Sequence, residues 1–133
     1  HGTSHVVTGD KDGCAVSMTT TINTGFGSRV MVPETGLILN NEMNDFSIPG
    51  VSNNFGYDPS PANFIVPGKR PLSSMSPTIV ELAGKLYFMT GAAGGSKIIT
   101  STIQSLRNVL DLNMSLGDSA AEPRFHDQLL PNQ

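Results

Sequence analysis

The chain has 133 residues, a length that fits one domain or part of one. Its 8 basic and 11 acidic side chains give a formal net charge of −3, whereas a nucleic-acid-binding surface needs a basic patch to contact phosphates. Hydrophobic residues make up 38% of the chain, which is ordinary for a folded protein and argues against disorder. We therefore expect a folded domain with no nucleic-acid partner.

Charged side chains make up only 14% of the sequence, which is low for a soluble surface and predicts that another subunit covers part of it. The single cysteine, Cys14, excludes an internal disulfide, and we interpret it as a small buried apolar residue. The absence of a CxxC motif or a histidine cluster predicts no zinc site. The chain begins with His1 and not with Met, so we expect its natural N-terminus to lie further upstream.

A β-hairpin is predicted at the start of the chain. Residues 4–8 and 14–23 are rich in β-branched side chains, and the sequence Asp10-Lys11-Asp12-Gly13 between them is typical of a tight turn. Residues 36–39 predict a further short strand. Residues 48–72 are dominated by proline, asparagine and glycine without periodicity, which indicates a long functional loop.

The second half of the chain predicts a hairpin followed by a helix. Residues 78–82 and 85–90 flank the turn Ala83-Gly84, and residues 96–112 carry apolar side chains at helical spacing. Residues 119–122 predict a short second helix, and residues 123–133 an irregular end. Hairpins followed by a helix that packs on them describe a layered α+β domain.

Three segments carry most of the polar chemistry. Residues 39–47 are dense in oxygen acceptors, residues 69–77 read Lys-Arg-Pro-Leu-Ser-Ser-Met-Ser-Pro, and residues 90–96 form a glycine-rich turn before the predicted helix. In this order, from Thr3 to about Asn132, they resemble the small catalytic subunit of the gamma-glutamyltransferase (gamma-glutamyl transpeptidase) family. The resemblance implies an N-terminal-nucleophile hydrolase fold, an αββα sandwich to which this chain would contribute only the small-subunit part.

The same resemblance divides the chain. Residues 1–2 would be the tail of the upstream large-subunit segment before the cleavage site. Residues 3–133 would be the small-subunit catalytic domain, incomplete at its C-terminus because the family's small subunit continues with further strands.

Thr3 is the nucleophile that the resemblance implies, because Thr3-Ser4-His5 matches the family's Thr-x-His start. A threonine hydroxyl needs a base, and an α-amino group with a pKa of about 7.7 can serve once the Gly2–Thr3 bond is cut. Thr21, in the matching Thr-x-Asn sequence, would orient the Thr3 oxygen. On local sequence alone, both threonines are ordinary strand residues.

The resemblance also implies a binding site for the amino-acid end of a γ-glutamyl substrate. Asn23, Glu42 and Asp45 would hold the α-ammonium group, which suits three oxygen acceptors that include a carboxylate. Ser73 and Ser74 would hold the α-carboxylate, with an arginine of the large subunit as the other anchor. Locally, these five residues could equally be turn, cap or strand-end residues.

Gly94 and Gly95 match the family's oxyanion hole, where backbone N–H groups at a helix start face the developing charge. Taken alone, the pair could equally be a phosphate cradle or a helix cap, although no Gly-Lys-Ser/Thr follows to form a P-loop. Phe55 replaces a pocket-gating tyrosine of bacterial members. Residues 59–65 resemble eukaryotic, and in our interpretation fungal, members. The histidine of Arg124-Phe125-His126 is interpreted as structural, and His5 as a residue that supports the site from behind it and is not catalytic.

The expected function is transfer of a γ-glutamyl group from glutathione or a related compound to water, an amino acid or a dipeptide, with no cofactor or metal. Two alternatives stay open: an inactive or orphan fragment, and a cephalosporin-acylase-like amidase. The expected partner is the large subunit of the same precursor. That subunit predicts an extracellular, membrane-anchored protein or a vacuolar one, and the glycosylation sequon Asn113-Met114-Ser115 supports export weakly.

Overall fold

The computed structural model describes residues 2–132, so His1 and Gln133 lie outside the described residues. Strands β1 (Thr3–Gly9) and β2 (Ala15–Thr21) form an antiparallel hairpin whose register runs from Thr3 opposite Thr21 to Gly9 opposite Ala15. The Asp10 carboxylate accepts the N–H groups of Asp12 and Cys14, and Gly13 takes a left-handed φ of 89°. The predicted first hairpin is confirmed. Asp10 closes its turn by side-chain hydrogen bonds, and Gly13 supplies the left-handed backbone.

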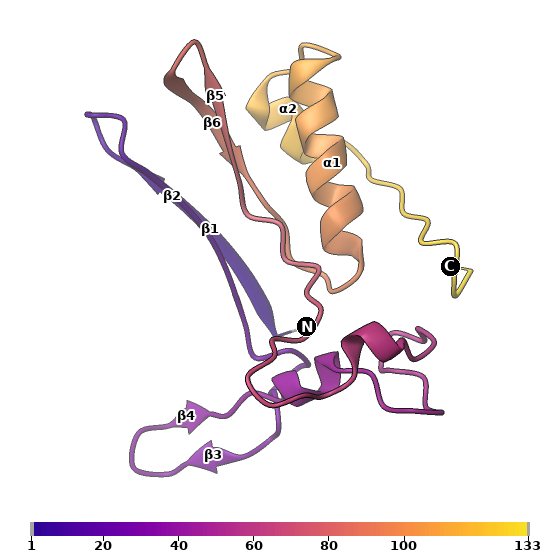
Figure 1. The fold of residues 1–133 in the computed structure, drawn as a ribbon. Helices are drawn as coiled ribbons and strands as arrows, with labels where there is room; N and C mark the ends of the chain where they lie inside the picture. Colours follow the sequence, from indigo (N-terminus) through magenta and orange to yellow (C-terminus); the bar gives the residue numbers. More distant parts are fainter. Residues whose placement is uncertain (1, 133) are drawn as a thin grey trace.

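The second hairpin pairs β5 (Thr78–Leu82) with β6 (Lys85–Thr90), with a bulge between Val80 and Glu81. It lies beside β2, and the Ser17 hydroxyl donates to the Thr90 carbonyl across 3.4 Å. Figure 1 shows the two hairpins next to each other, with the helices to one side. The α+β class is thereby confirmed.

Helix α1 (Lys97–Leu110) packs on β6 and against the short helix α2 (Leu116–Ala121). Helix α2 begins earlier than the predicted residues 119–122, because the Ser115 hydroxyl caps it by accepting the Asp118 N–H. No helix among residues 2–132 combines the length and apolar character needed to span a bilayer.

The chain between the two hairpins is largely irregular. It contains the two-residue strands β3 (Met31–Val32) and β4 (Leu37–Ile38) and the 3₁₀ helices η1 (Glu42–Asp45) and η2 (Pro61–Asn63). Strand β4 matches the predicted short strand, whereas its partner β3 was not predicted. The predicted long loop of residues 48–72 is irregular apart from η2 and isolated bridges.

The core is small for a chain of this length. Within residues 2–132, its buried apolar side chains are Phe46, Phe88, Ile98 and Val109. The accessible surface is 9126 Å², whereas a folded monomer of this mass exposes on the order of 6,700 Å². Many large apolar side chains are exposed, and one face of the first hairpin exposes Val6, Val16 and Met18.

The burial predicted for Cys14 is wrong, because its side chain is exposed. The second strand begins one residue later than predicted, at Ala15. Cys14 therefore lies at the end of the turn, where side chains meet solvent.

Candidate active site

The two threonines predicted to work together are paired across the first hairpin. Thr3 is the first residue of β1 and lies opposite Thr21, the last residue of β2, so their side chains share one face of the sheet. Their Oγ1 atoms are 2.9 Å apart and joined by a hydrogen bond. Thr21 Oγ1 also accepts the Asn23 N–H across 2.8 Å, which leaves the Thr21 proton available to the Thr3 oxygen.

Asn23 connects this pair to the acidic segment. It is buried, takes a left-handed φ of 72°, and its Nδ2 donates to Asp45 Oδ1 (3.0 Å) and to the Asn41 carbonyl (3.2 Å). The asparagine therefore fixes the carboxylate of Asp45, at the end of η1, beside the two threonines. Left-handed backbone at a non-glycine residue is costly, and asparagine tolerates it better than most.

Glu42 lies one turn away from Asp45 on η1. Burial first, and then hydrogen bonding to Asp45 and its negative charge, raise the pKa of Glu42 from 4.5 to about 7. Its Oε1 is buried and has no hydrogen-bond partner among the described residues. A cation placed between the two carboxyl groups would relieve both the repulsion and the unmet hydrogen-bonding capacity.

Ser73 and Ser74 approach the site from the segment before β5. The Ser73 hydroxyl accepts the Met75 N–H across 3.2 Å, whereas the Ser74 hydroxyl makes no hydrogen bond among the described residues. The Ser73 contact is a local turn of the kind that the sequence also allowed, and the geometry leaves both hydroxyls able to donate to a ligand.

The glycine-rich turn leads directly into α1. Gly94 and Gly95 have φ values of 133° and 62°, a backbone that favours glycine. Their carbonyls accept from Lys97 and Ile98, whereas their N–H groups find no acceptor within residues 2–132. A Cβ on Gly95 would lie 2.6 Å from Cε1 of Phe55, so this position also admits no larger residue.

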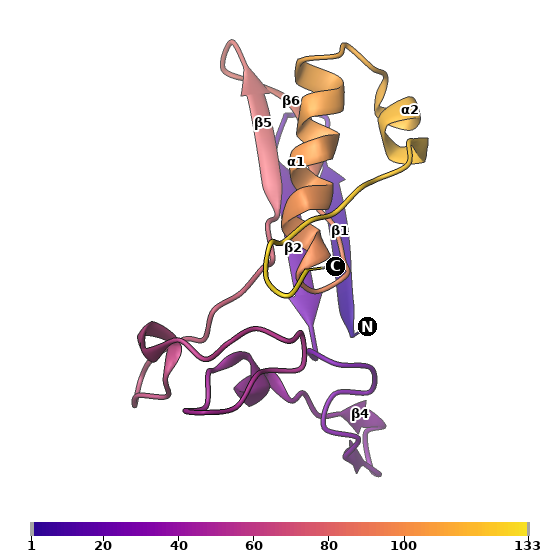
Figure 2. The ribbon, with the colours of Figure 1, turned by 90° about the vertical axis from the view of Figure 1, so that its right-hand side faces the viewer.

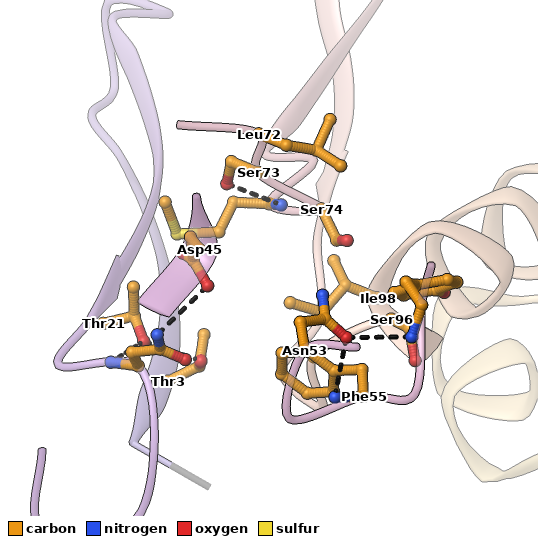
Figure 3. Close-up of a pocket in the computed structure, with 14 residues that line it drawn as sticks. Thr3, Thr21, Asp45, Asn53, Phe55, Leu72, Ser73, Ser74, Ser96 and Ile98 are labelled. Carbon is orange, nitrogen blue, oxygen red and sulfur yellow. Dashed lines mark hydrogen bonds between the residues drawn. The ribbon is translucent and has the colours of Figure 1, made fainter. Parts of the chain in front are cut away.

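One cavity of about 70 Å³ collects most of these groups. It is lined by seven of the nine predicted site residues: Thr3, Thr21, Asn23, Asp45, Ser73, Ser74 and Gly95. Glu42 and Gly94 do not line it, although each is close in sequence to a residue that does. In Figure 3, the threonines and Asp45 face Asn53 and Phe55 across the cavity, with Ser73 and Ser74 along another side.

Six further lining residues were not predicted individually as site residues: Asn53, Tyr57, Leu72, Met75, Ser96 and Ile98. Asn53 is the most informative of them, because its Oδ1 accepts the N–H groups of both Phe55 and Tyr57 across 2.9 Å. The pattern Asn-x-x-Gly at residues 53–56 is typical of such a turn and could have indicated a shaped loop.

The two histidines of interest lie outside the cavity lining. His5 Nδ1 is hydrogen-bonded to the Thr19 hydroxyl (2.8 Å), and its ring packs against Gly91 at the start of the glycine-rich turn. His126 Nδ1 is hydrogen-bonded to the Thr100 hydroxyl on α1 across 2.8 Å. Neither histidine lines the cavity, and the roles predicted for them stay predictions.

The fold and the cavity together define an α+β domain whose polar site is built around a pair of threonine hydroxyls. A profile of the gamma-glutamyltranspeptidase family matches residues 1–133, and the chain belongs to that family.

Three comparisons show how similar known members are. The chain is 64% identical to the glutathione hydrolase proenzyme of Arthroderma benhamiae over 132 residues, which is 98% of this chain and 23% of that protein. A crystal structure of a mutant Helicobacter pylori gamma-glutamyltranspeptidase superposes with a TM-score of 0.90 at 48% identity, covering 96% of this chain and 69% of the other. An acivicin-inhibited gamma-glutamyltranspeptidase gives the same TM-score and identity, with 96% and 68% covered.

The 64% identity to a fungal protein agrees with the predicted fungal resemblance. The chain spans less than a quarter of the length of that curated relative.

Proposed function

We propose that the protein carrying this chain transfers γ-glutamyl groups through a threonyl ester on Thr3. The observation that carries this proposal is the hydrogen-bonded Thr3–Thr21 pair, which opens into the same cavity as Asp45. Family membership supports it, and so does the 64% identity to a fungal glutathione hydrolase proenzyme.

In the proposed first step, Thr3 Oγ1 attacks the γ-carbonyl carbon of the donor. A C–O bond forms, the amide C–N bond breaks, and the hydroxyl proton passes through the α-amine of Thr3 to the leaving amine. In the uncut chain the Thr3 nitrogen is an amide and cannot accept that proton, so cleavage of the Gly2–Thr3 bond must come first. The ester is then resolved by water or by the amine of an amino acid or dipeptide.

The donor's amino-acid end would lie between the acidic segment and the serine segment. Asp45, held by Asn23, would bind the α-ammonium, and Glu42 beside it would add a second carboxyl. Ser73 and Ser74, on another side of the cavity, would donate to the α-carboxylate. The free N–H groups of Gly94 and Gly95 would stabilise the oxyanion, helped by the N-terminal end of α1.

A partner is proposed because the chain exposes far more surface than a self-contained domain does. The excess over a folded monomer is about 2,400 Å², and apolar side chains on the first hairpin contribute to it. A large subunit from the same precursor would cover this face and complete the αββα sandwich. We further propose an extracellular location, with membrane anchoring through the large subunit, or a vacuolar one, as the family resemblance implies.

The test uses the full-length protein that carries this chain. It is incubated with a chromogenic γ-glutamyl anilide, quenched and digested, and the peptide that contains Thr3 is examined by mass spectrometry. We expect a γ-glutamyl adduct on Thr3, and no release of the aniline by Thr3→Ala. An adduct on a different residue would overturn the assignment.

A glutaryl anilide, which lacks the α-amino group, separates this function from the amidase alternative. We expect it to react at least about 100-fold more slowly, because the carboxyl groups of the site would face no ammonium. Equal rates for the two donors would favour a cephalosporin-acylase-like amidase.

A further inference from the structure

The chain after α2 runs back along α1 toward the end at which that helix begins (Figure 2). Gln104 of α1 holds its backbone at two points, since Gln104 Nε2 donates to the Phe125 carbonyl (2.6 Å) and Gln104 Oε1 accepts the Phe125 N–H (3.1 Å). These two hydrogen bonds to one residue fix the register of the segment on the helix.

From there, a chain of side-chain hydrogen bonds leads away from α1. His126 Nδ1 is bonded to the Thr100 hydroxyl, and His126 Nε2 lies 2.9 Å from Gln128 Oε1. The Tyr57 hydroxyl donates to the same Gln128 oxygen across 3.0 Å. The partly buried side-chain oxygen of Gln128 therefore joins the Tyr57 hydroxyl to the His126 ring.

Tyr57 ends the tight loop of residues 53–57, which the Asn53 side chain closes. The C-terminal segment also packs on the backbone of this loop, because a Cβ on Gly56 would lie 3.0 Å from Cγ of Pro131. The segment therefore meets the loop through one hydrogen bond and one apolar contact.

The loop forms one wall of the cavity. Asn53, Phe55 and Tyr57 all line it, and the Phe55 ring lies against Gly95. Anything that fixes the loop on α1 therefore also fixes the Phe55 ring over the glycine turn at the start of the same helix.

We propose that the Tyr57–Gln128–His126 hydrogen-bond chain is a latch that holds the loop of residues 53–57 in place over Gly95. His126 and Gln128 are positioning residues: they do not line the cavity, and they act on it through Tyr57. The proposal rests on the proposed function only for its kinetic readout, because the position of the loop can be measured without turnover.

Hydrogen exchange of the full-length protein tests the latch directly. The N–H groups of Asn53, Phe55, Gly56 and Tyr57 are all hydrogen-bonded within the loop. In Gln128→Leu, we expect the peptide that covers them to exchange roughly 2- to 12-fold faster, the factor that loss of one typical hydrogen bond produces. Asp127→Asn, an exposed change in the same segment, should leave exchange unaltered.

Tyr57→Phe provides a second, conservative variant that removes the other end of the same bond. It should raise exchange by a similar factor, and the double variant should add little to either single change. Unaltered exchange in the loop would overturn the latch, and so would a uniform increase that includes β1 and β2.

The kinetic readout tests the positioning role. Loosening the wall should raise the KM for the γ-glutamyl donor while kcat stays constant, since a mobile wall weakens ground-state and transition-state binding alike. A fall in kcat at constant KM would contradict this, and so would faster loop exchange with neither parameter changed. A protein without γ-glutamyl transfer activity would refute the proposed function, and the exchange experiment would still decide on the latch.

Discussion

Replacement of Thr21 by valine tests the pairing of the two threonines most cleanly. Valine keeps the β-branched shape that suits a strand and removes only the hydroxyl. The Thr3 oxygen then loses its partner at 2.9 Å, and the Asn23 N–H loses its acceptor at 2.8 Å. A hydrogen bond to an oxygen that gains charge contributes roughly 1.5–3 kcal/mol, which corresponds to a decrease in kcat of about 10- to 150-fold.

The assay is release of the aniline from a γ-glutamyl anilide, normalised to the amount of chain with a free Thr3 end. We expect the donor KM to change little, because the proposed substrate contacts are made by other residues. Thr20→Val is the matched control: Thr20 lies next to Thr21, but its side chain is exposed on the opposite face, opposite Ser4. If Thr21→Val kept its full kcat in a processed, folded protein, the orienting role of Thr21 would be wrong.

Three further predictions concern Glu42 and two residues that line the cavity, Asp45 and Gly95. Between pH 4.5 and about 7, Glu42 binds more protons in the folded protein than in the unfolded chain, so the free energy of unfolding should fall as pH rises through this range. The Glu42→Gln variant should lose this pH dependence in melting experiments. Asp45→Asn should raise the KM for a γ-glutamyl donor about tenfold or more but not that for a glutaryl donor, because the ammonium loses its charged partner. Gly95→Ala should lower kcat about 100-fold, whereas Gly13→Ala, also at positive φ but in open space, should affect only stability.

Local patterns were sufficient to predict both main hairpins and α1. The Asp10–Gly13 turn and the Ala83-Gly84 turn supply the backbone that each reversal needs, with φ values of 89° at Gly13 and 75° at Gly84. The apolar spacing of residues 97–110 likewise predicted the helix within a few residues. These elements depend on neighbours in the sequence, which is why the sequence alone could indicate them.

The remaining features depend on distant contacts. Strand β3 has only two residues and exists because Met31 pairs with Ile38, a signal too short to detect in the sequence. Asn53 and Tyr57 line the cavity because the loop folds across to the start of α1, which no local pattern indicates. Among the predicted site residues, Glu42 lies beside Asp45 on η1, but its side chain does not line the cavity.

The proposed mechanism requires cleavage of the Gly2–Thr3 bond, which makes Thr3 the first residue of the catalytic subunit. Intact-mass and N-terminal analysis of the full-length protein, expressed with its upstream segment, measures this directly. We expect a chain that begins at Thr3, and a Thr3→Ala variant that stays uncut. A folded protein that remains joined between Gly2 and Thr3 would contradict it.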